Sequence, residues 1–69
     1  MKEISLSTEF IKLDQLLKYI GIAETGGHSK FLIKNGEVKV NGQITTERGK
    51  KIRKGDMVEV SGEEIFIVV

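Results

Sequence analysis

The spacing of apolar residues changes along this 69-residue chain and predicts where its strands and helices lie. Residues 2–7 alternate polar side chains with Ile4 and Leu6, which is typical of a short edge strand. The next apolar residues recur three or four positions apart, as on one side of an amphipathic helix: Leu13, Leu16, Leu17 and Ile20. Gly21 follows at once, and a glycine at this place commonly ends a helix.

A second short helix is predicted between Thr25 and Gly36. Thr25 is a suitable N-cap, because its hydroxyl can accept an unpaired amide hydrogen of the first turn. Ser29, Leu32 and Ile33 fall on one face of this helix. The opposite face carries Gly27, Lys30, Phe31 and Lys34. Two short helices joined by a few residues resemble a helix-turn-helix unit.

After Gly36 the apolar period becomes two, so Val38 and Val40 lie on one side of a strand. Asn41-Gly42 predicts a tight hairpin turn, because both central residues of the favoured turn need a positive φ. This backbone role also accounts for Asn41 without an RNA contact. The segments expected next are a return strand at 43–46, a basic connection at 47–56, a strand at 57–60, a turn at 61–64 and a final strand at 65–69.

These elements predict an α+β domain in which two short helices pack on a small antiparallel or mixed sheet of four to five strands. The length allows one domain, residues 1–69. The chain has no cysteine, which excludes disulfides and thiol chemistry. It shows neither a signal peptide nor an apolar stretch of membrane-spanning length. We expect a cytoplasmic monomer without a cofactor or metal.

Positive charge is concentrated in the middle of the chain. Residues 30–54 hold eight of the eleven lysines and arginines against two glutamates, a formal charge of +6, whereas the other residues sum to −5. The overall charge of +1 therefore hides a marked asymmetry. Such a concentration of cations on a small element is typical of proteins that bind the phosphates of a nucleic acid.

The second helix offers candidate contacts that also have plain structural explanations. Lys30 and Lys34 form either a solvated face or a pair of phosphate ligands near a helix start, where the dipole favours anions. Gly26 and Gly27 form either a simple turn or a place where a phosphate approaches the backbone closely. The lone histidine, His28, is expected to be structural, with a phosphate contact as the alternative.

Phe31 shares the basic face of the second helix. We expect its ring to pack beneath the hairpin or the C-terminal strand; the alternative is stacking on an unpaired base or a ribose.

Five basic residues crowd the connection after the hairpin: Arg48, Lys50, Lys51, Arg53 and Lys54. Its glycines leave the backbone mobile, so the connection can fold along a nucleic-acid backbone. The two arginines suit bidentate phosphate contacts, whereas the lysines act as point charges.

Catalysis is not indicated. One histidine and two aspartates do not make a nucleophile–base–acid set, and neither a phosphate-binding loop nor a dinucleotide fingerprint is present. We therefore expect a binding surface, with no small-molecule substrate.

Three runs of residues in this order resemble one known family, the S-four RNA-binding domain with its alpha-L motif. They are Ile11 to Lys18 (IKLDQLLK), Thr25 to Gly42 (TGGHSKFLIKNGEVKVNG) and Lys54 to Val60 (KGDMVEV). The resemblance covers residues 11–60, the expected core of the motif. Many members begin the second helix with Ser-Arg-x-x-Ala, and here Gly26 stands at the arginine position.

The resemblance implies two helices on a small, strongly bent sheet that binds structured RNA, mainly ribosomal or transfer RNA, through the second helix and the hairpin. The chain looks like the small free-standing bacterial members, of the YaaA or YbcJ type. The family surface would fall on Lys12, Thr25, His28, Lys30, Lys34 and Lys39.

The sequence thus predicts a non-enzymatic RNA-binding protein, with ribosomal RNA or a ribosomal subunit as the main expected partner and transfer RNA as another. The alternative is a protein-interaction module that uses the edge of the apolar C-terminal strand at 65–69.

Overall fold

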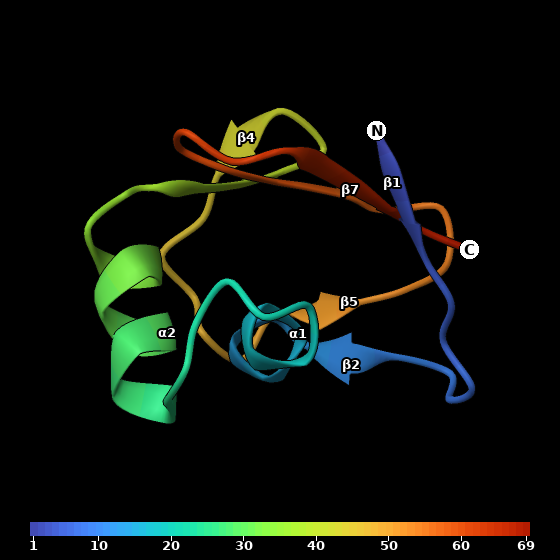
Figure 1. Cartoon of the computed structure of the whole chain (residues 1–69), viewed down its shortest axis with the longest axis horizontal. Coiled ribbons are helices and arrows are strands. Elements are labelled where there is room, and N and C mark those ends of the chain that lie inside the picture. The colour runs from blue at the N-terminus through green and yellow to red at the C-terminus, as the bar shows by residue number, and fades with distance from the viewer.

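The computed structural model describes all of residues 1–69 and contains two helices, a five-stranded sheet and a two-stranded sheet (Figure 1). The helices are α1 (Leu13–Tyr19) and α2 (Gly26–Lys34). The strands are β1 (Lys2–Ile4), β2 (Ile11–Lys12), β3 (Val38–Val40), β4 (Gln43–Ile44), β5 (Lys51–Ile52), β6 (Met57–Val60) and β7 (Ile65–Val68). Neither helix has the length and apolar character needed to cross a membrane.

The large sheet has the strand order β1-β7-β6-β3-β4, and only the β1–β7 pair is parallel. The α+β prediction of two helices on a mixed sheet is therefore confirmed. The free edge at the C-terminal strand, which the alternative of a protein-interaction module needs, is not present, because β7 is hydrogen-bonded to β1 on one side and to β6 on the other. Strand β1 thus covers the edge that a partner strand would need.

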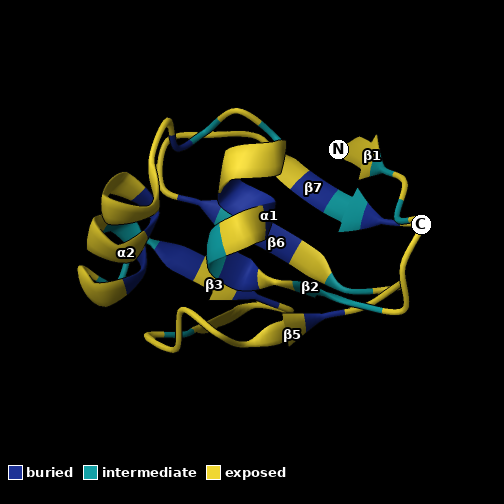
Figure 2. Cartoon of the chain, turned by 90° about the horizontal axis from the view of Figure 1, so that it is seen from below, coloured by how far each residue is buried: buried dark blue, intermediate teal, exposed yellow.

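The core lies between two layers. One layer is the five-stranded sheet, and the other contains α1, α2 and the β2–β5 pair (Figure 1). The inner side chains are buried, whereas most of the outer surface is exposed (Figure 2). Leu13, Leu16 and Leu17 of α1 have no exposed surface, and the burial of each stabilises the fold by about 2 kcal/mol. Helix α1 therefore occupies the centre of its layer.

The end of each helix follows the predicted pattern. At α2, Gly36 has a φ of +75°, and the amides of Gly36 and Glu37 donate to the carbonyls of Ile33 and Leu32. This arrangement satisfies carbonyls that the helix leaves unpaired. Helix α1 ends in the same way at Gly21. The chain therefore turns abruptly into the α1–α2 connection and into β3.

The hairpin between β3 and β4 is fastened to the segment that precedes β6. Asn41 and Gly42 both have a positive φ, +52° and +84°, as the sequence predicts. The Asn41 side chain donates to Oδ1 of Asp56 at 3.0 Å and accepts from the Met57 amide at 2.9 Å. Oδ2 of Asp56 accepts from the Arg53 amide at 2.8 Å. Asn41 therefore has a structural role, and Asp56 joins two segments that are distant in sequence.

The two-stranded sheet is a feature that the sequence did not predict. Strand β5 lies within the segment 47–56 that was expected to be a mobile connection, and it pairs with β2. The return strand is shorter than predicted and ends at Ile44. Strands of two residues are too short to show a period of two, so the polar and apolar pattern does not reveal them.

Replacing Asp56 with asparagine is expected to lower the free energy of unfolding at neutral pH by about 1–2 kcal/mol, since it removes a charged acceptor of two hydrogen bonds. Partial burial opposes ionisation of Asp56, but hydrogen bonds from Arg53 and Asn41 and the charges of Lys50 and Arg53 hold its pKa below the ordinary value. Ionised Asp56 therefore adds stability above the pKa of the unfolded chain, and this contribution is lost as the pH falls through the lower pKa of the folded protein.

Urea unfolding of both proteins between pH 7 and pH 2 provides the test. The difference in unfolding free energy should begin to shrink below about pH 4, the ordinary pKa of an aspartate, and continue to shrink as the pH falls through the lower pKa of Asp56 in the folded protein. A difference that remains the same down to pH 2 would show that the charge of Asp56 does not contribute.

Candidate nucleic-acid interface

The first turn of α1 holds the basic connection in place. The N-cap residue Lys12 makes no side-chain cap. Instead, the amides of Leu13 and Asp14 donate to the carbonyls of Lys50 and Arg48, at 2.8 and 3.0 Å. The connection therefore supplies the acceptors that the helix N-terminus needs. These bonds fix the backbone of residues 48–50 beside α1 and leave the basic side chains of this segment exposed to solvent.

The same turn of α1 also holds α2. Ser29 is completely buried, and its hydroxyl donates to the carbonyl of Asp14 at 3.0 Å. Its position on the inner face of α2, beside Ile33, agrees with the sequence prediction. The buried hydroxyl is thus satisfied, which avoids the cost of an unpaired polar group. Helix α2 and the basic connection are therefore positioned relative to each other through Asp14.

The outer face of α2 carries an open hollow of about 350 Å³, lined by Gly27, Lys30, Phe31, Lys34 and Asn35. The Phe31 side chain is 61% exposed, so the expected packing beneath the hairpin or the C-terminal strand is wrong. Phe31 stands two positions from both Ser29 and Ile33, and two helical positions turn a side chain to nearly the opposite side. The two lysines and the ring predicted on one face are therefore brought together.

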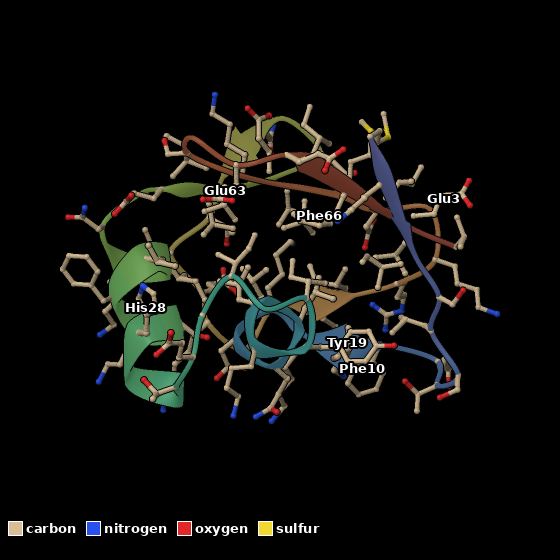
Figure 3. All side chains as sticks on the ribbon, viewed as in Figure 1. Glu3, Phe10, Tyr19, His28, Glu63 and Phe66 are labelled. Atoms are coloured by element: carbon tan, nitrogen blue, oxygen red, sulfur yellow. The ribbon has the colours of Figure 1, made fainter.

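The N-terminus of α2 is capped as predicted. Oγ1 of Thr25 accepts from the amide of His28 at 3.0 Å, whereas the amides of Gly26 and Gly27 make no hydrogen bond within the protein. A Cβ atom at Gly26 would meet nothing within 4 Å. The first turn contains no acidic residue, and His28 has an exposed side chain on this helix (Figure 3). This end of α2 thus has free donors and a favourable dipole for an anion.

No lysine or arginine forms an ion pair with a carboxylate. The only ion pair in the chain joins the amino group of Met1 to Glu64 at 3.7 Å. Several acidic residues belong to the five-stranded sheet and its turns: Glu3, Glu59, Glu63 and Glu64. Glu3 is seen on the sheet side of the molecule at the end far from α2, and Glu63 lies at the turn between β6 and β7 (Figure 3). The helical layer consequently presents most of the uncompensated positive charge.

The structure does not bring all the predicted residues together. Lys39 lies between the buried Val38 and Val40 of β3, so it points from the outer face of the large sheet, away from the helices. Lys54 precedes Gly55, whose amide donates to the Val68 carbonyl, and therefore lies near the end of β7. The predictions for Lys39 and Lys54 were based on the charge along the sequence. In the structure, the alternation of side chains in β3 directs Lys39, and the hydrogen bond of the neighbouring Gly55 places Lys54.

Two residues near the candidate surface were missed by the sequence analysis. The Phe10 ring lies 4.9 Å from Nζ of Lys51 and 5.7 Å from Cζ of Arg53. Asn35 lines the hollow on α2, and its amide nitrogen donates to Glu37 at 2.8 Å. Phe10 could have been found from the alternation of Phe10, Ile11 and Lys12, which is typical of a strand. Asn35 gave no signal beyond its helical spacing from Phe31.

The architecture is an alpha-L fold, and the chain belongs to the S4 domain family, whose model matches residues 4–68. The predicted family resemblance is thereby confirmed. The solved structure of YbcJ from Escherichia coli superposes with a TM-score of 0.75 and 36% identity, over 100% of this chain and 87% of that one. The YbcJ structure contains an alpha-L motif involved in RNA binding.

Two curated relatives from Bacillus subtilis (strain 168) show how the domain is used in shorter and longer proteins. "Probable ribosome maturation protein RlbA" is 41% identical over 66 residues, which cover 96% of this chain and 93% of that protein. "Ribosomal large subunit pseudouridine synthase B" is 37% identical over 54 residues, 78% of this chain but 22% of that protein. The chain thus matches nearly all of the first relative and a small part of the second.

Replacing Thr25 with alanine is expected to lower the free energy of unfolding by about 1 kcal/mol, because the His28 amide loses its acceptor. Thr25→Ser keeps the hydroxyl and is the matched control. Chemical denaturation measures the stability of both variants. Equal stability of Thr25→Ala and the parent protein would show that the cap contributes nothing.

Proposed function

We propose that this protein binds structured RNA without catalysing a reaction, and that its target is ribosomal RNA in a ribosome or a maturing subunit. The observation that carries the proposal is the outer face of α2. There an exposed phenylalanine lies between two lysines that form no ion pair with a carboxylate. Membership of the S4 family and the names of the ribosome-related relatives support the choice of target.

The hollow on α2 suits a nucleotide that is not base-paired. Lys30 and Lys34 would contact phosphates, and the free amides of Gly26 and Gly27 would donate to the oxygens of another phosphate at the start of the helix. The face of Phe31 would stack on an unpaired base. Sequence-specific RNA recognition commonly uses bases in loops and bulges, because the deep groove of an RNA helix is closed to side chains. The ligand would therefore be a folded RNA with an accessible loop.

The basic connection would follow the same RNA beyond α2. The Arg48 and Lys50 side chains are exposed on a backbone that is fixed to the first turn of α1. A fixed backbone reduces the conformational entropy that is lost when these side chains bind. The arginine can contact a phosphate in bidentate geometry. The two lysines of the hollow and the connection would together give affinity for the backbone, and the shape of the RNA would give selectivity.

A protein-interaction role based on the C-terminal strand has less support, since β7 has neighbours on both sides. Transfer RNA would offer similar loops and phosphates. The names of the relatives favour ribosomal RNA, because they refer to ribosome maturation and to the large subunit.

Changing Lys30 and Lys34 together to glutamate is expected to lower RNA affinity at least 100-fold without unfolding the domain, since both side chains are exposed. Lys2→Glu with Lys39→Glu is the matched control, because it makes the same charge change on the five-stranded sheet. Filter binding to ribosomal RNA and circular dichroism provide the measurements. Equal losses in the two double variants would exclude α2 as the specific interface.

The proposal also predicts how binding depends on salt. If four or five phosphates are neutralised, log K should fall with log salt at a slope of roughly −3 to −4. Co-sedimentation with ribosomes should disappear at about 0.5 M salt and after nuclease treatment. A complex that survives both treatments would instead indicate a protein partner.

A further inference from the structure

The outer face of the β2–β5 pair carries three cations, two of which lie over an aromatic ring. In this antiparallel pair Ile11 is opposite Ile52, and Lys12 is opposite Lys51. Ile52 is completely buried, so its neighbours Lys51 and Arg53 point to the other side. Phe10 and Lys12 flank Ile11 in the same way. The face defined by Phe10, Lys12, Lys51 and Arg53 is called the ribbon face below.

The charges on the ribbon face are unfavourable in the free protein. Like charges at directly opposed positions of a strand pair repel each other, and here Lys12 faces Lys51 with Arg53 close by. None of the three has a carboxylate within ion-pair distance. The ring of Phe10, with Nζ of Lys51 at 4.9 Å and Cζ of Arg53 at 5.7 Å from its centroid, offsets part of this repulsion.

We infer that the ribbon face is a second phosphate-binding site for the RNA backbone, separate from the hollow on α2, with Phe10 as its positioning residue. The inference rests on the proposed function and specifies a further part of the ligand contact. A polyanion would relieve the repulsion among the three cations. The ring holds Lys51 and Arg53 in one place, so less side-chain entropy is lost on binding.

The placement of the ribbon face makes the domain bivalent. Strands β2 and β5 lie on one side of α1, and α2 lies on the other (Figure 1). The hollow and the ribbon face therefore contact different stretches of one RNA. Each contains an exposed or partly exposed phenylalanine among cations, Phe31 in the hollow and Phe10 on the ribbon face. The first ring is free to stack on a base, whereas the second is already engaged by cations.

The test measures binding of a fluorescein-labelled ribosomal RNA hairpin as a function of salt. Changing Lys51 and Arg53 together to glutamine should reduce the magnitude of the salt slope by about 1.5, the value for two phosphates. Phe10→Leu keeps an apolar side chain but removes the ring, and should weaken binding about threefold to tenfold. Phe10→Tyr keeps the ring and should restore parental affinity. Tyr19→Leu removes an exposed aromatic ring at the C-terminal end of α1 that has no cation over it; it is the matched control and should have no effect.

A double-mutant comparison distinguishes positioning from direct contact. If Phe10 acts through the two cations, Phe10→Leu should cause no further loss in the variant that lacks Lys51 and Arg53. The same loss in both backgrounds would overturn the positioning role. An unchanged salt slope in the Lys51→Gln, Arg53→Gln variant would overturn the site itself while leaving the proposed function intact.

Inorganic tripolyphosphate separates this inference from the proposed function. In NMR titrations it should shift the ring signals of Phe10 and the side-chain signal of Arg53, and these shifts should vanish in the Lys51→Gln, Arg53→Gln variant. Such shifts in a protein that fails to bind the RNA hairpin would support the anion site and overturn the RNA function. If neither tripolyphosphate nor the RNA hairpin shifts the signals of Phe10 and Arg53, the ribbon face is not a binding site.

Discussion

The first turn of α1 is the constraint on which the rest of the candidate interface depends. The amides of Leu13 and Asp14 are bonded to the carbonyls of the basic connection, and the carbonyl of Asp14 accepts from the buried hydroxyl of Ser29. The first turn of α1 therefore holds both the cationic segment and α2 in place. The leucines of α1 fix that turn in the core. A surface built from segments distant in sequence can keep its shape in so small a domain because these bonds are buried or backbone-based.

Stability and function place opposing demands on the helical layer. A chain of this length has a limited core, and unpaired cations add repulsion. The protein meets these demands by partly separating its charges. Glu3, Glu59, Glu63 and Glu64 belong to the large sheet and its turns, whereas Lys12, Lys18, Lys30 and Lys34 belong to the helical layer. Local ion pairs would remove the repulsion but would also neutralise the surface that a polyanion needs. The single ion pair between the N-terminus and Glu64 lies outside the cationic region.

The sequence predicted those features that depend on local rules. The spacing of the leucines, the Thr25 cap and the Asn41-Gly42 turn each depend on neighbouring residues, and all appear in the structure. The β2–β5 pair was missed because it joins two-residue strands that are distant in sequence. Because this pair was not predicted, the contacts of Phe10 with Lys51 and Arg53 were not predicted either. For Lys39, alternation within β3 was predicted, but the side of the sheet that the helices cover was not.

Glycine at position 26 shows how charge can be redistributed in such a domain. Many members of the family have an arginine there, and an added Cβ atom would meet no protein atom within 4 Å. A larger side chain at position 26 would therefore not clash with the protein, so packing does not explain the glycine. Without a side chain, the backbone amides at the start of α2 are open to an anion. In the proposed interface one guanidinium contact is thus replaced by backbone donors on α2, while arginines are provided by the segment after the hairpin. Because that segment is bonded to α1, the relocated charge still lies on the layer that carries α2.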